Sequence, residues 1–404
     1  MTQRPPSSLP TGRLRRLAGL ARAGAGMARG MIDRDPVAPI ARAVETLSEL
    51  RGLATKVGQM GGIWSAMLPP EERARAEIIL ARLRSHTASS SAEAVRSLVE
   101  AELGAPIAEL FATFEPEPFA SASIGQVHRA TLPDGTVVAV KVQHPGIAAA
   151  LRSDLANVEN IGGLATLLAF TDARAVMDEV RARFEAELDY ADEARNLARF
   201  ADLFAGDPEI DIPTLVPSLS SGRVLTTRFV EGADVGVAAG WPNARELGRV
   251  VRRFMKTSWL VHGLLFADPH AGNWIFHRDG RVTVLDFGCV VPFAEADRAS
   301  LRRVLEAIER GDDDVARADL RSLVHAPAGH AGELLAESMR IALAPLALDR
   351  PARPDDLERI VRLSGEAKRR LLGKRLTVPP WTPLLLRALL GTTALLAGLE
   401  ARCT

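Results

Sequence analysis

Apolar residues recur every three or four positions over much of this 404-residue chain, and this is the period of an amphipathic helix. Residues 38–60 follow this period closely. Two further helices are predicted over residues 71–84, after a Pro-Pro pair, and over residues 92–103, after a Ser-rich break. The first hundred residues are therefore predicted to be mainly helical.

The pattern changes to strands between Phe111 and Val142. Two runs rich in β-branched residues, 127–132 and 136–142, are separated by Pro133-Asp134-Gly135, and Asp-Gly between such runs is a strong hairpin signal. Two more short strands, joined through Ser220-Ser221-Gly222, are predicted between residues 216 and 230.

Helical periodicity dominates the rest of the chain. One long helix is predicted over residues 173–204, and the region beyond Glu231-Gly232 is predicted to be helical except for a strand pair at 274–277 and 281–285. The most apolar stretch, 384–399, contains Arg387 near its start and is shorter than the ~20 residues of a membrane span, which favours a helix packed inside the fold.

This order of elements predicts an α+β protein with a small strand-rich lobe and a large helical lobe. The predicted domains are a basic N-terminus at 1–37, a helical extension at 38–110, the small lobe at 111–230 and the large lobe at 231–404.

Composition narrows the possible functions. Lys and Arg balance Asp and Glu, with 50 of each, and the pI is about 7.1, so a basic nucleic-acid-binding protein is not expected. Cys289 and Cys403 are the only cysteines, which excludes a disulfide framework. We expect a cytoplasmic protein.

The N-terminal 32 residues contain six arginines and no acid. Three interpretations remain open: a segment that binds anionic lipid, an organellar transit peptide, and a solvated basic tail. The first would give peripheral membrane contact.

The sharpest chemical signal is the segment Phe266-Ala-Asp-Pro-His-Ala-Gly-Asn273, followed after a short hairpin by Leu285-Asp-Phe-Gly288. Phosphoryl transfer from a metal nucleotide needs one carboxylate to orient the attacking oxygen, predicted here as Asp268. It also needs an amide and a second carboxylate to hold Mg²⁺, predicted as Asn273 and Asp286.

Two charged groups upstream fit this chemistry. Lys141, in Val-Val-Ala-Val-Lys-Val, could contact nucleotide phosphates, although a Lys in this position is also typical of a solvated edge strand. Glu185, Asp189 and Glu193 are spaced to share one face of the long predicted helix. They are interpreted either as carboxylate partners for such a cation or as a solvated acidic face.

The segment that would cover the phosphates is unusual. It precedes the first clear strand and has one glycine, where an ordinary kinase has several. Its residues form the predicted nucleotide-binding loop: Ala120, Ser121, Ala122, Ser123, Ile124, Gly125 and Gln126. The sequence has no P-loop motif, no long activation segment after Gly288, and Ala267 rather than Arg before Asp268, which argues against P-loop NTPases and regulated protein kinases.

These motifs, taken in order, resemble the UbiB (AarF) family of atypical protein-kinase-like proteins. Lys56-Val-Gly-Gln59 looks like the family's Lys-x-Gly-Gln motif, and Glu187-Leu-Asp189 looks like its Glu-x-Asp motif. The loop at 120–126 resembles its alanine-rich loop. The sequence departs from the family pattern at Ser121, inside the alanine run, and at Ala271, where proline is usual.

The resemblance implies a two-lobed protein-kinase-like fold with an N-terminal helical extension that binds ATP or ADP with Mg²⁺. It implies that Lys56, with Gln59 on the same helix, meets Glu187 or Asp189, and that Glu193 meets Lys141. Glu231, at the predicted hinge, is assigned to the nucleotide-binding set.

The resemblance further implies an atypical kinase or ATPase that supports ubiquinone biosynthesis or lipid homeostasis. Its partners would be a lipid, a quinone intermediate or quinone-biosynthesis enzymes. Two alternatives remain open: a small-molecule phosphotransferase of the antibiotic-kinase type, and a nucleotide-sensing scaffold without turnover.

Overall fold

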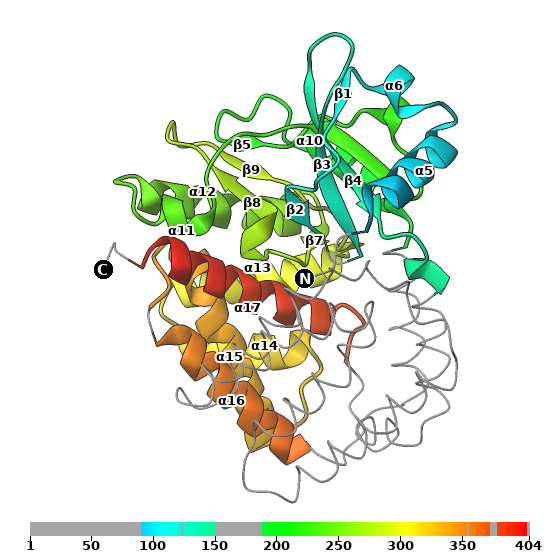
Figure 1. The fold of residues 1–404 in the computed structure, drawn as a ribbon. Helices are drawn as coiled ribbons and strands as arrows, with labels where there is room; N and C mark the ends of the chain where they lie inside the picture. The colour runs from blue at the N-terminus through cyan, green and yellow to red at the C-terminus, as the bar shows by residue number, and fades with distance from the viewer. Residues whose placement is uncertain (1–89, 123, 150–187, 354, 372–377, 402–404) are drawn as a thin grey trace, which may run out of the picture. The chain divides into compact units, whose positions relative to one another are not determined.

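The computed structural model describes most of the chain from residue 90 onward (Figure 1). Lys56, Gln59, Ser123, Glu185 and Glu187 lie outside the described residues, as does the chain before residue 90. The described ranges are 90–122, 124–149, 188–353, 355–371 and 378–401.

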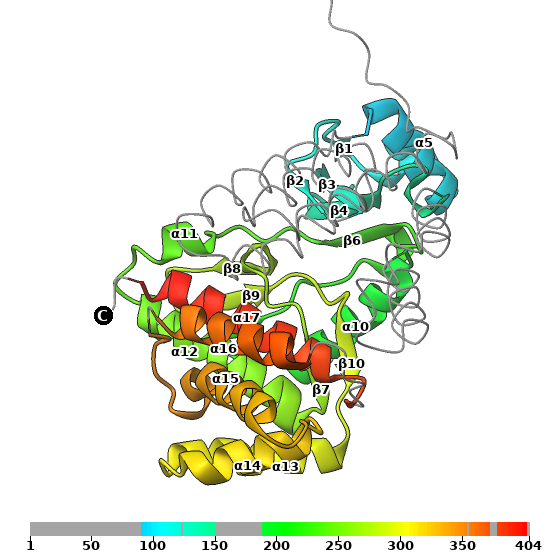
Figure 2. The ribbon, with the colours of Figure 1, turned by 90° about the horizontal axis from the view of Figure 1, so that it is seen from below.

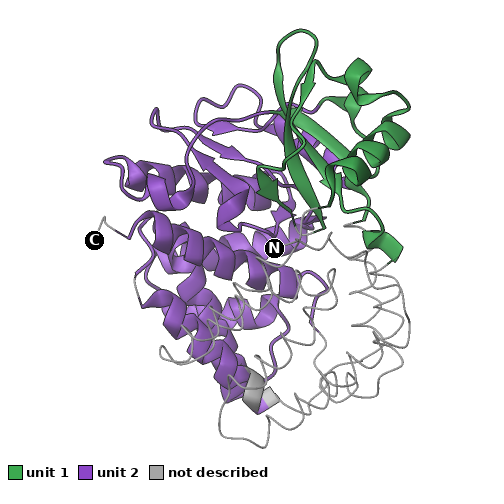
Figure 3. Cartoon of the chain, viewed as in Figure 1, with its two compact units in different colours: residues 1–191, 216–228 green, residues 192–215, 229–404 purple. Residues whose placement is uncertain are grey.

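The described residues fall into two compact units (Figure 3). Unit 1 contains the described residues up to Ala191 together with Val216–Arg228, and unit 2 contains Asp192–Leu215 and the chain from Phe229 onward. The domain boundaries predicted above stay predictions.

Unit 1 is built on a five-stranded antiparallel sheet with the order β1-β3-β4-β6, and β2 also pairs with β3. Helices α5 and α6 precede the sheet in the chain. The bounds are α5 Ala92–Leu103, α6 Ile107–Leu110, β1 Thr113–Phe114, β2 Ala120–Ser121, β3 Gly125–Thr131, β4 Val137–Gln143 and β6 Val224–Arg228.

Local sequence explains the two best-predicted elements of unit 1. Helix α5 begins where the Ser91 side chain accepts a hydrogen bond from the Ala94 amide and ends at Gly104, whose φ is 76°. The β3–β4 hairpin turns where Asp134 Oδ1 accepts from the Thr136 amide at 2.8 Å and Gly135 has a φ of 87°. Both predictions are confirmed.

The core of unit 1 lies between one face of the sheet and α5. Val138, Val140 and Val142 alternate along β4 and are all fully buried, and they belong to the same apolar cluster as Val95 and Val99 of α5. This period of two fixes which face of β4 is buried, so Lys141 lies on the opposite face.

Unit 2 combines a stack of helices with two small sheets (Figure 2). Strand β10 pairs with β7, and a second sheet has the order β5-β9-β8. The strand bounds are β5 Ile210–Asp211, β7 Leu264–Phe266, β8 Trp274–Phe276, β9 Val282–Val284 and β10 Val290–Pro292.

The helices of unit 2 pack in succession, α13 on α14, α14 on α15, and α15 on both α16 and α17. Helix α10 begins at the last residues of unit 1 and continues into unit 2. The bounds are α10 Tyr190–Leu203, α11 Val235–Ala238, α12 Ala244–Lys256, α13 Glu295–Glu309, α14 Asp313–Leu323, α15 His330–Ala347, α16 Asp356–Leu371 and α17 Thr382–Leu399.

The structure corrects three sequence predictions. Within the described part of the long helix predicted over 173–204, Leu188 lies in a turn and Asp189 precedes α10, which begins at Tyr190. The first of the two strands predicted between 216 and 230 is instead a 3-10 turn at Pro217–Leu219, where proline has no N–H to donate to a strand ladder. Strands β5, β7 and β10 were not predicted, because two or three residues are too few to show alternation.

Helix α17 is the one helix among the described residues that is long and apolar enough to cross a membrane. Its mean hydropathy is 1.5, and 56% of the helix is buried inside the protein. Leu385, Leu389 and Leu396 belong to the core of unit 2, which accounts for their apolar character. The predicted helix packed inside the fold is confirmed.

Candidate functional site

The β7–β10 pair brings the two acidic motifs of unit 2 together. Phe266 is paired with Val290, and the Ala267 amide donates to the Cys289 carbonyl at 2.9 Å. Asp268 lies two residues beyond the end of β7, and Asp286 comes three residues before Cys289. The two carboxylates therefore stand on adjoining backbone segments although a hairpin separates them in the sequence.

Asn273 ties the same two segments together from a third position. Its side-chain Nδ2 donates to the Asp268 carbonyl at 3.0 Å, and its own carbonyl accepts from the Leu285 amide at 2.9 Å. The short 3-10 turn Ala271–Asn273 shapes this loop, with His270 Nδ1 accepting from the Gly272 amide. Asp268, Asn273 and Asp286 are thus held in one place in unit 2.

The Asp286-Phe287-Gly288 turn is held by contacts with α10 and by a hydrogen bond within the turn itself. Phe287 is fully buried and its ring centroid lies 4.6 Å from that of Phe200 on α10. Asn196 of α10 donates to the Phe287 carbonyl at 3.1 Å, and Asp286 Oδ1 accepts from the Gly288 amide at 2.9 Å. The carboxylate of Asp286 is therefore oriented before any ligand binds.

Glu193 also lies next to this turn. It is 6% exposed, and its Oε2 is 3.6 Å from the point where a Cβ on Gly288 would stand, while Asp286 Oδ1 is 3.2 Å from that point. The structure therefore places Glu193 beside the Asp286 turn within unit 2. Its expected pairing with Lys141 stays a prediction.

Arg387 is the residue of this site that the sequence argument did not assign. Its Nη2 lies 2.8 Å from Asp268 Oδ2, and both side chains are about one-third exposed, at 31% and 30%. Burial lowers the pKa of Arg387, but the charges of Asp268 and Asp286 raise it to above its usual value. The signal in the sequence was a single charge within the apolar stretch 384–399.

The donor set fits a magnesium ion. Carboxylate and amide oxygens are hard ligands, and Mg²⁺ usually takes one or two protein ligands and keeps several waters. Asn273 uses its amide nitrogen on Asp268, which leaves the amide oxygen as the donor it can offer. Over the part of the chain that the structure describes, no group of three His, Cys, Asp or Glu side chains is placed to hold a metal.

Lys141 lies in the middle of the sheet of unit 1. Its strand β4 is paired with β3 on one side and β6 on the other, so the alternative of a solvated edge strand is wrong. The Lys141 Nζ lies 4.9 Å from the ring centroid of Tyr190, the only tyrosine of the chain. A cation over this aromatic face is held by electrostatic attraction as well as by packing.

Tyr190 also approaches the predicted nucleotide-binding loop. A Cβ on Gly125 would stand 2.8 Å from the Tyr190 hydroxyl and 2.4 Å from the Val142 carbonyl oxygen, so only glycine fits there. The Ala122 amide donates to the Gly125 carbonyl at 2.9 Å, and Ala120 and Ser121 form β2 against β3. Close contact with the backbone, rather than a positive φ, explains the single glycine of this loop.

The end of the loop points into the interior of unit 1. Ile124 is buried, and the polar atoms of Gln126 are engaged with Ser90 at 2.7 Å and His128 at 2.9 Å. Burial lowers the pKa of His128, whose Nδ1 donates to the Glu115 carbonyl. The side chain of Gln126 is therefore a structural group, and its assignment to nucleotide binding stays a prediction.

Asp189 does not share a helical face with Glu193. It precedes α10, and its Oδ1 accepts from the Ala191 amide at 2.9 Å. Gln143 fixes the preceding residue, because its Nε2 donates to the Leu188 carbonyl at 2.8 Å and to the Gly222 carbonyl at 3.2 Å. The expected common face is wrong because the chain is held in a turn at this point.

Glu231 is exposed on the connection that follows β6, and it belongs to unit 2. The next residue, Gly232, lies so close to β8 that a Cβ on it would stand 2.3 Å from Ile275 Cγ2. Ala233 then forms a β-bridge with Phe276. The connection is therefore held against β8 by backbone contacts.

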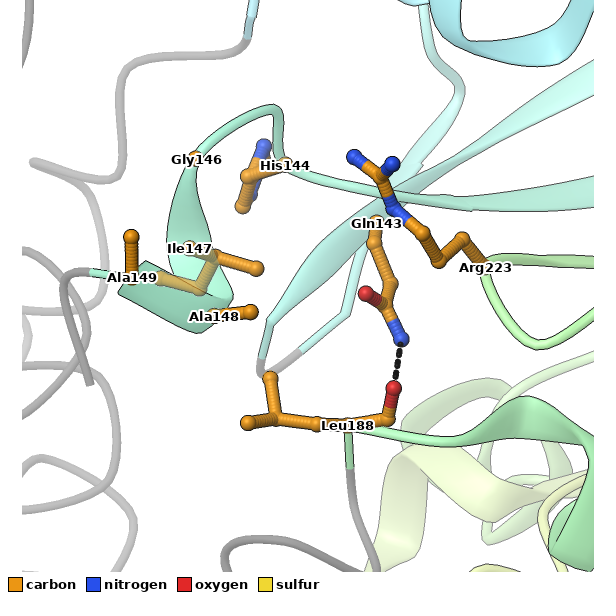
Figure 4. A pocket seen from close by; sticks show the side chains of 8 residues that line it. All are labelled: Gln143, His144, Gly146, Ile147, Ala148, Ala149, Leu188 and Arg223. Carbon is orange, nitrogen blue, oxygen red and sulfur yellow. Dashed lines mark hydrogen bonds between the residues drawn. The ribbon is translucent and has the colours of Figure 1, made fainter. Parts of the chain in front are cut away.

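One cavity of about 410 Å³ opens at the end of β4 in unit 1 (Figure 4). In this view the Gln143 side chain points toward the Leu188 carbonyl, and the Arg223 side chain lies on the other side of Gln143 from Ile147. The lining residues are Gln143, His144, Gly146, Ile147, Ala148, Ala149, Leu188 and Arg223, and none of them belongs to the predicted site.

Comparison with known proteins identifies the family to which this chain belongs. Residues 82–319 match the model of the ABC1 atypical kinase-like domain, which is more than half of the chain. This chain belongs to the UbiB family of atypical kinase-like proteins. The predicted kinase-like α+β fold is thereby confirmed for this UbiB-family protein.

Its curated relatives include an uncharacterized Synechocystis protein, 32% identical over 70% of this chain and 43% of that protein. The mitochondrial atypical kinase coq-8 of Caenorhabditis elegans is 34% identical over 61% of this chain and 33% of its own length. The mitochondrial atypical kinase COQ8 of Saccharomyces cerevisiae is 29% identical over 74% of this chain and 63% of its own length. The UbiB-family chain thus spans between a third and two-thirds of the length of these relatives.

A solved structure gives a more complete match. Rv3197 of Mycobacterium tuberculosis, determined in complex with erythromycin, superposes with a TM-score of 0.59 and 25% identity. The match covers 85% of this UbiB-family chain and 88% of that protein.

Proposed function

We propose that this UbiB-family protein is an atypical kinase or ATPase that binds MgATP. The observation that carries the proposal is the gathering of Asp268, Asn273 and Asp286 in unit 2 by the β7–β10 pair and by the two hydrogen bonds of Asn273. A carboxylate, an amide and a second carboxylate, in this order along the chain, are the groups that phosphoryl transfer from a metal nucleotide requires.

Each residue has a proposed role. Asn273 and Asp286 would hold Mg²⁺, which neutralises charge on phosphate oxygens when it is bound. Lys141 and the loop at 120–126 would contact the phosphates, and Glu231 would contact the nucleotide. Asp268 would orient the attacking oxygen of an acceptor or of water. Lys56 and Gln59, outside the described residues, would meet Glu187 or Asp189 as in the family pattern.

The decisive test is nucleotide binding by Asp286→Asn. We expect calorimetry to show that Mg²⁺-dependent binding of ATP and ADP is lost, because the amide removes the negative charge that pairs with the metal. Asp279→Asn is the matched control, since this carboxylate lies in the exposed turn between β8 and β9 and pairs with Arg281. Equal affinity in wild type and Asp286→Asn would contradict the proposal.

The proposed cellular role is support of isoprenoid-quinone (ubiquinone) biosynthesis or lipid homeostasis at a membrane surface. Membership of the UbiB family supports it, as do the relatives named COQ8. The protein is proposed to be cytoplasmic with peripheral membrane contact through its Arg-rich N-terminus. If so, deletion of residues 1–32 should weaken sedimentation with anionic vesicles and leave nucleotide binding intact.

A second candidate is a small-molecule phosphotransferase, favoured by the likeness to the protein solved with erythromycin. Incubation with radiolabelled ATP and a panel of soluble acceptors, erythromycin included, separates it from an ATPase stimulated by liposomes or quinone headgroups. A nucleotide-sensing scaffold without turnover is the third candidate, and it is tested in cells that express the Asp268→Asn variant in place of the wild type. A scaffold would still maintain quinone levels in these cells, whereas an enzyme that needs Asp268 would not.

A further inference from the structure

Helix α17 packs directly on the loop that carries Asp268. Arg387 lies 2.8 Å from the Asp268 carboxylate, and Gly391, one helical turn later, faces Pro269. Positions four apart lie on the same face of a helix, so α17 contacts two consecutive residues of the loop with one face. Both contacts lie within unit 2.

Any side chain at position 391 would force the helix or the loop to shift. A Cβ there would stand 2.9 Å from Pro269 Cγ and 3.3 Å from Pro269 Cδ. Gly398, on the same helix, has only Val235 Cγ2 at 3.8 Å. Glycine within a helix is unfavourable relative to alanine, so the glycine at 391 is accounted for by this contact with the loop.

Helix α17 is itself anchored independently of the loop. Leu385, Leu389 and Leu396 are fully or almost fully buried in the core of unit 2. Just beyond the helix, Glu400 accepts from Arg252 of α12 at 2.7 Å, and both side chains are 1% exposed. The helix therefore provides a fixed support, and the loop rests against it.

Asp268 depends on such a support because of where it lies. It lies two residues beyond the end of β7, outside the strand ladder, and two rotatable bonds set the direction of its carboxylate. The ion pair between Arg387 and Oδ2 restricts rotation about both bonds. It occupies Oδ2 and leaves Oδ1 as the oxygen that can orient the attacking group. Arg387 also supplies positive charge beside two carboxylates, Asp268 and Asp286, that would otherwise repel each other.

We propose that helix α17 positions Asp268 for catalysis, with Arg387 as a positioning residue and Gly391 setting the distance between the helix and the loop. The proposal rests on the proposed function, in which Asp268 orients the attacking oxygen. Displacements of about 1 Å in such a group can cost about 100-fold in rate.

The first experiment compares ATP hydrolysis by the full chain as wild type, Arg387→Met, Arg387→Lys and Arg370→Met. Arg370→Met is the control, because Arg370 forms an exposed ion pair with Glu366 on α16. We expect Arg387→Met to lower kcat by about 10- to 100-fold, with KM for MgATP changed by less than about threefold. Arg387→Lys should recover part of kcat, since a cation is restored without the guanidinium geometry.

The second experiment compares Gly391→Ala with Gly398→Ala. Each variant replaces a glycine of α17 with alanine, but only Gly391→Ala places a methyl group against Pro269. We expect Gly391→Ala to lower kcat with KM retained and Gly398→Ala to leave kcat unchanged. Hydrogen exchange of the Gly272 and Asn273 amides should become faster in Arg387→Met and Gly391→Ala, and stay as in wild type in both controls.

The outcomes separate this proposal from the function on which it rests. If wild type binds or hydrolyses no nucleotide, the proposed function fails, and hydrogen exchange still decides whether α17 orders the loop. Unchanged or increased kcat in Arg387→Met, in an active wild type, would overturn the positioning role; an increase would identify the pair as inhibitory. Unchanged exchange in both loop-facing variants would overturn it as well.

Discussion

Asp207 offers the clearest quantitative test of how unit 2 is held together. It lies between α10 and β5, and its Oδ1 accepts from the Glu209 and Ile210 amides, each at 2.9 Å. Arg253 of α12 binds both of its oxygens, at 2.5 and 2.8 Å. The carboxylate thereby fixes the start of β5, which pairs with β9 immediately before the Asp286 turn.

The magnitude follows from the pKa. Hydrogen bonding from Arg253 lowers the pKa of Asp207 from 3.8 to about 2, against the opposing effect of partial burial. At ~1.36 kcal/mol per unit, this shift corresponds to roughly 2.4 kcal/mol as an upper bound. Asp207 is 16% and Arg253 33% exposed. Solvent screening therefore reduces the expected contribution to about 1–2 kcal/mol.

Asp207→Asn should therefore lower the free energy of unfolding by about 1–2 kcal/mol at pH 7. Because the folded-state pKa is below the unfolded one, the stabilisation is present above the unfolded pKa and is lost as pH falls toward 2. The difference between wild type and variant should shrink between about pH 5 and pH 2.

Urea unfolding followed by tryptophan fluorescence is a suitable assay, because four of the five tryptophans lie in unit 2, at 241, 259, 274 and 381. Asp279→Asn is the control, since Asp279 also pairs with an arginine but is 54% exposed. A difference that stays constant from pH 7 to pH 3, or an equal loss in the control, would refute the reasoning.

Two further predictions concern glycine packing and a buried charge. Gly125→Ala should destabilise unit 1 by about 1–3 kcal/mol, because its methyl group meets the Val142 carbonyl, and should weaken nucleotide binding in calorimetry. Gly135→Ala is its control, with a positive φ but open space around it, and an equal loss of binding there would contradict the steric argument. Arg252→Met should cost about 3–5 kcal/mol in denaturant unfolding, because it leaves Glu400 buried without its partner. The double variant with Glu400→Leu should recover much of that loss, whereas Arg370→Met should cost less than about 1 kcal/mol.

Local sequence determined the elements whose signals are short-range. The cap at Ser91, the glycine at 104 and the Asp134-Gly135 turn each act through neighbouring backbone groups, so helix α5 and the β3–β4 hairpin could be predicted. The order of Asp268, Asn273 and Asp286 also indicated the chemistry, because the spacing of these motifs is a property of the chain itself. The family resemblance rested on the same motifs and was confirmed.

Tertiary structure decided the contacts between segments that are distant in the sequence. Arg387 meets Asp268, and Tyr190 lies against both Lys141 and Gly125, through packing that no periodicity encodes. The same holds for β7 and β10, whose pairing joins segments on either side of a hairpin. Asp189 does not lie on the predicted helical face, because the Gln143 side chain of β4 bonds the Leu188 and Gly222 carbonyls and holds the preceding backbone in a turn. Helical spacing describes one continuous segment, and it fails where hydrogen bonds from elsewhere end the helix.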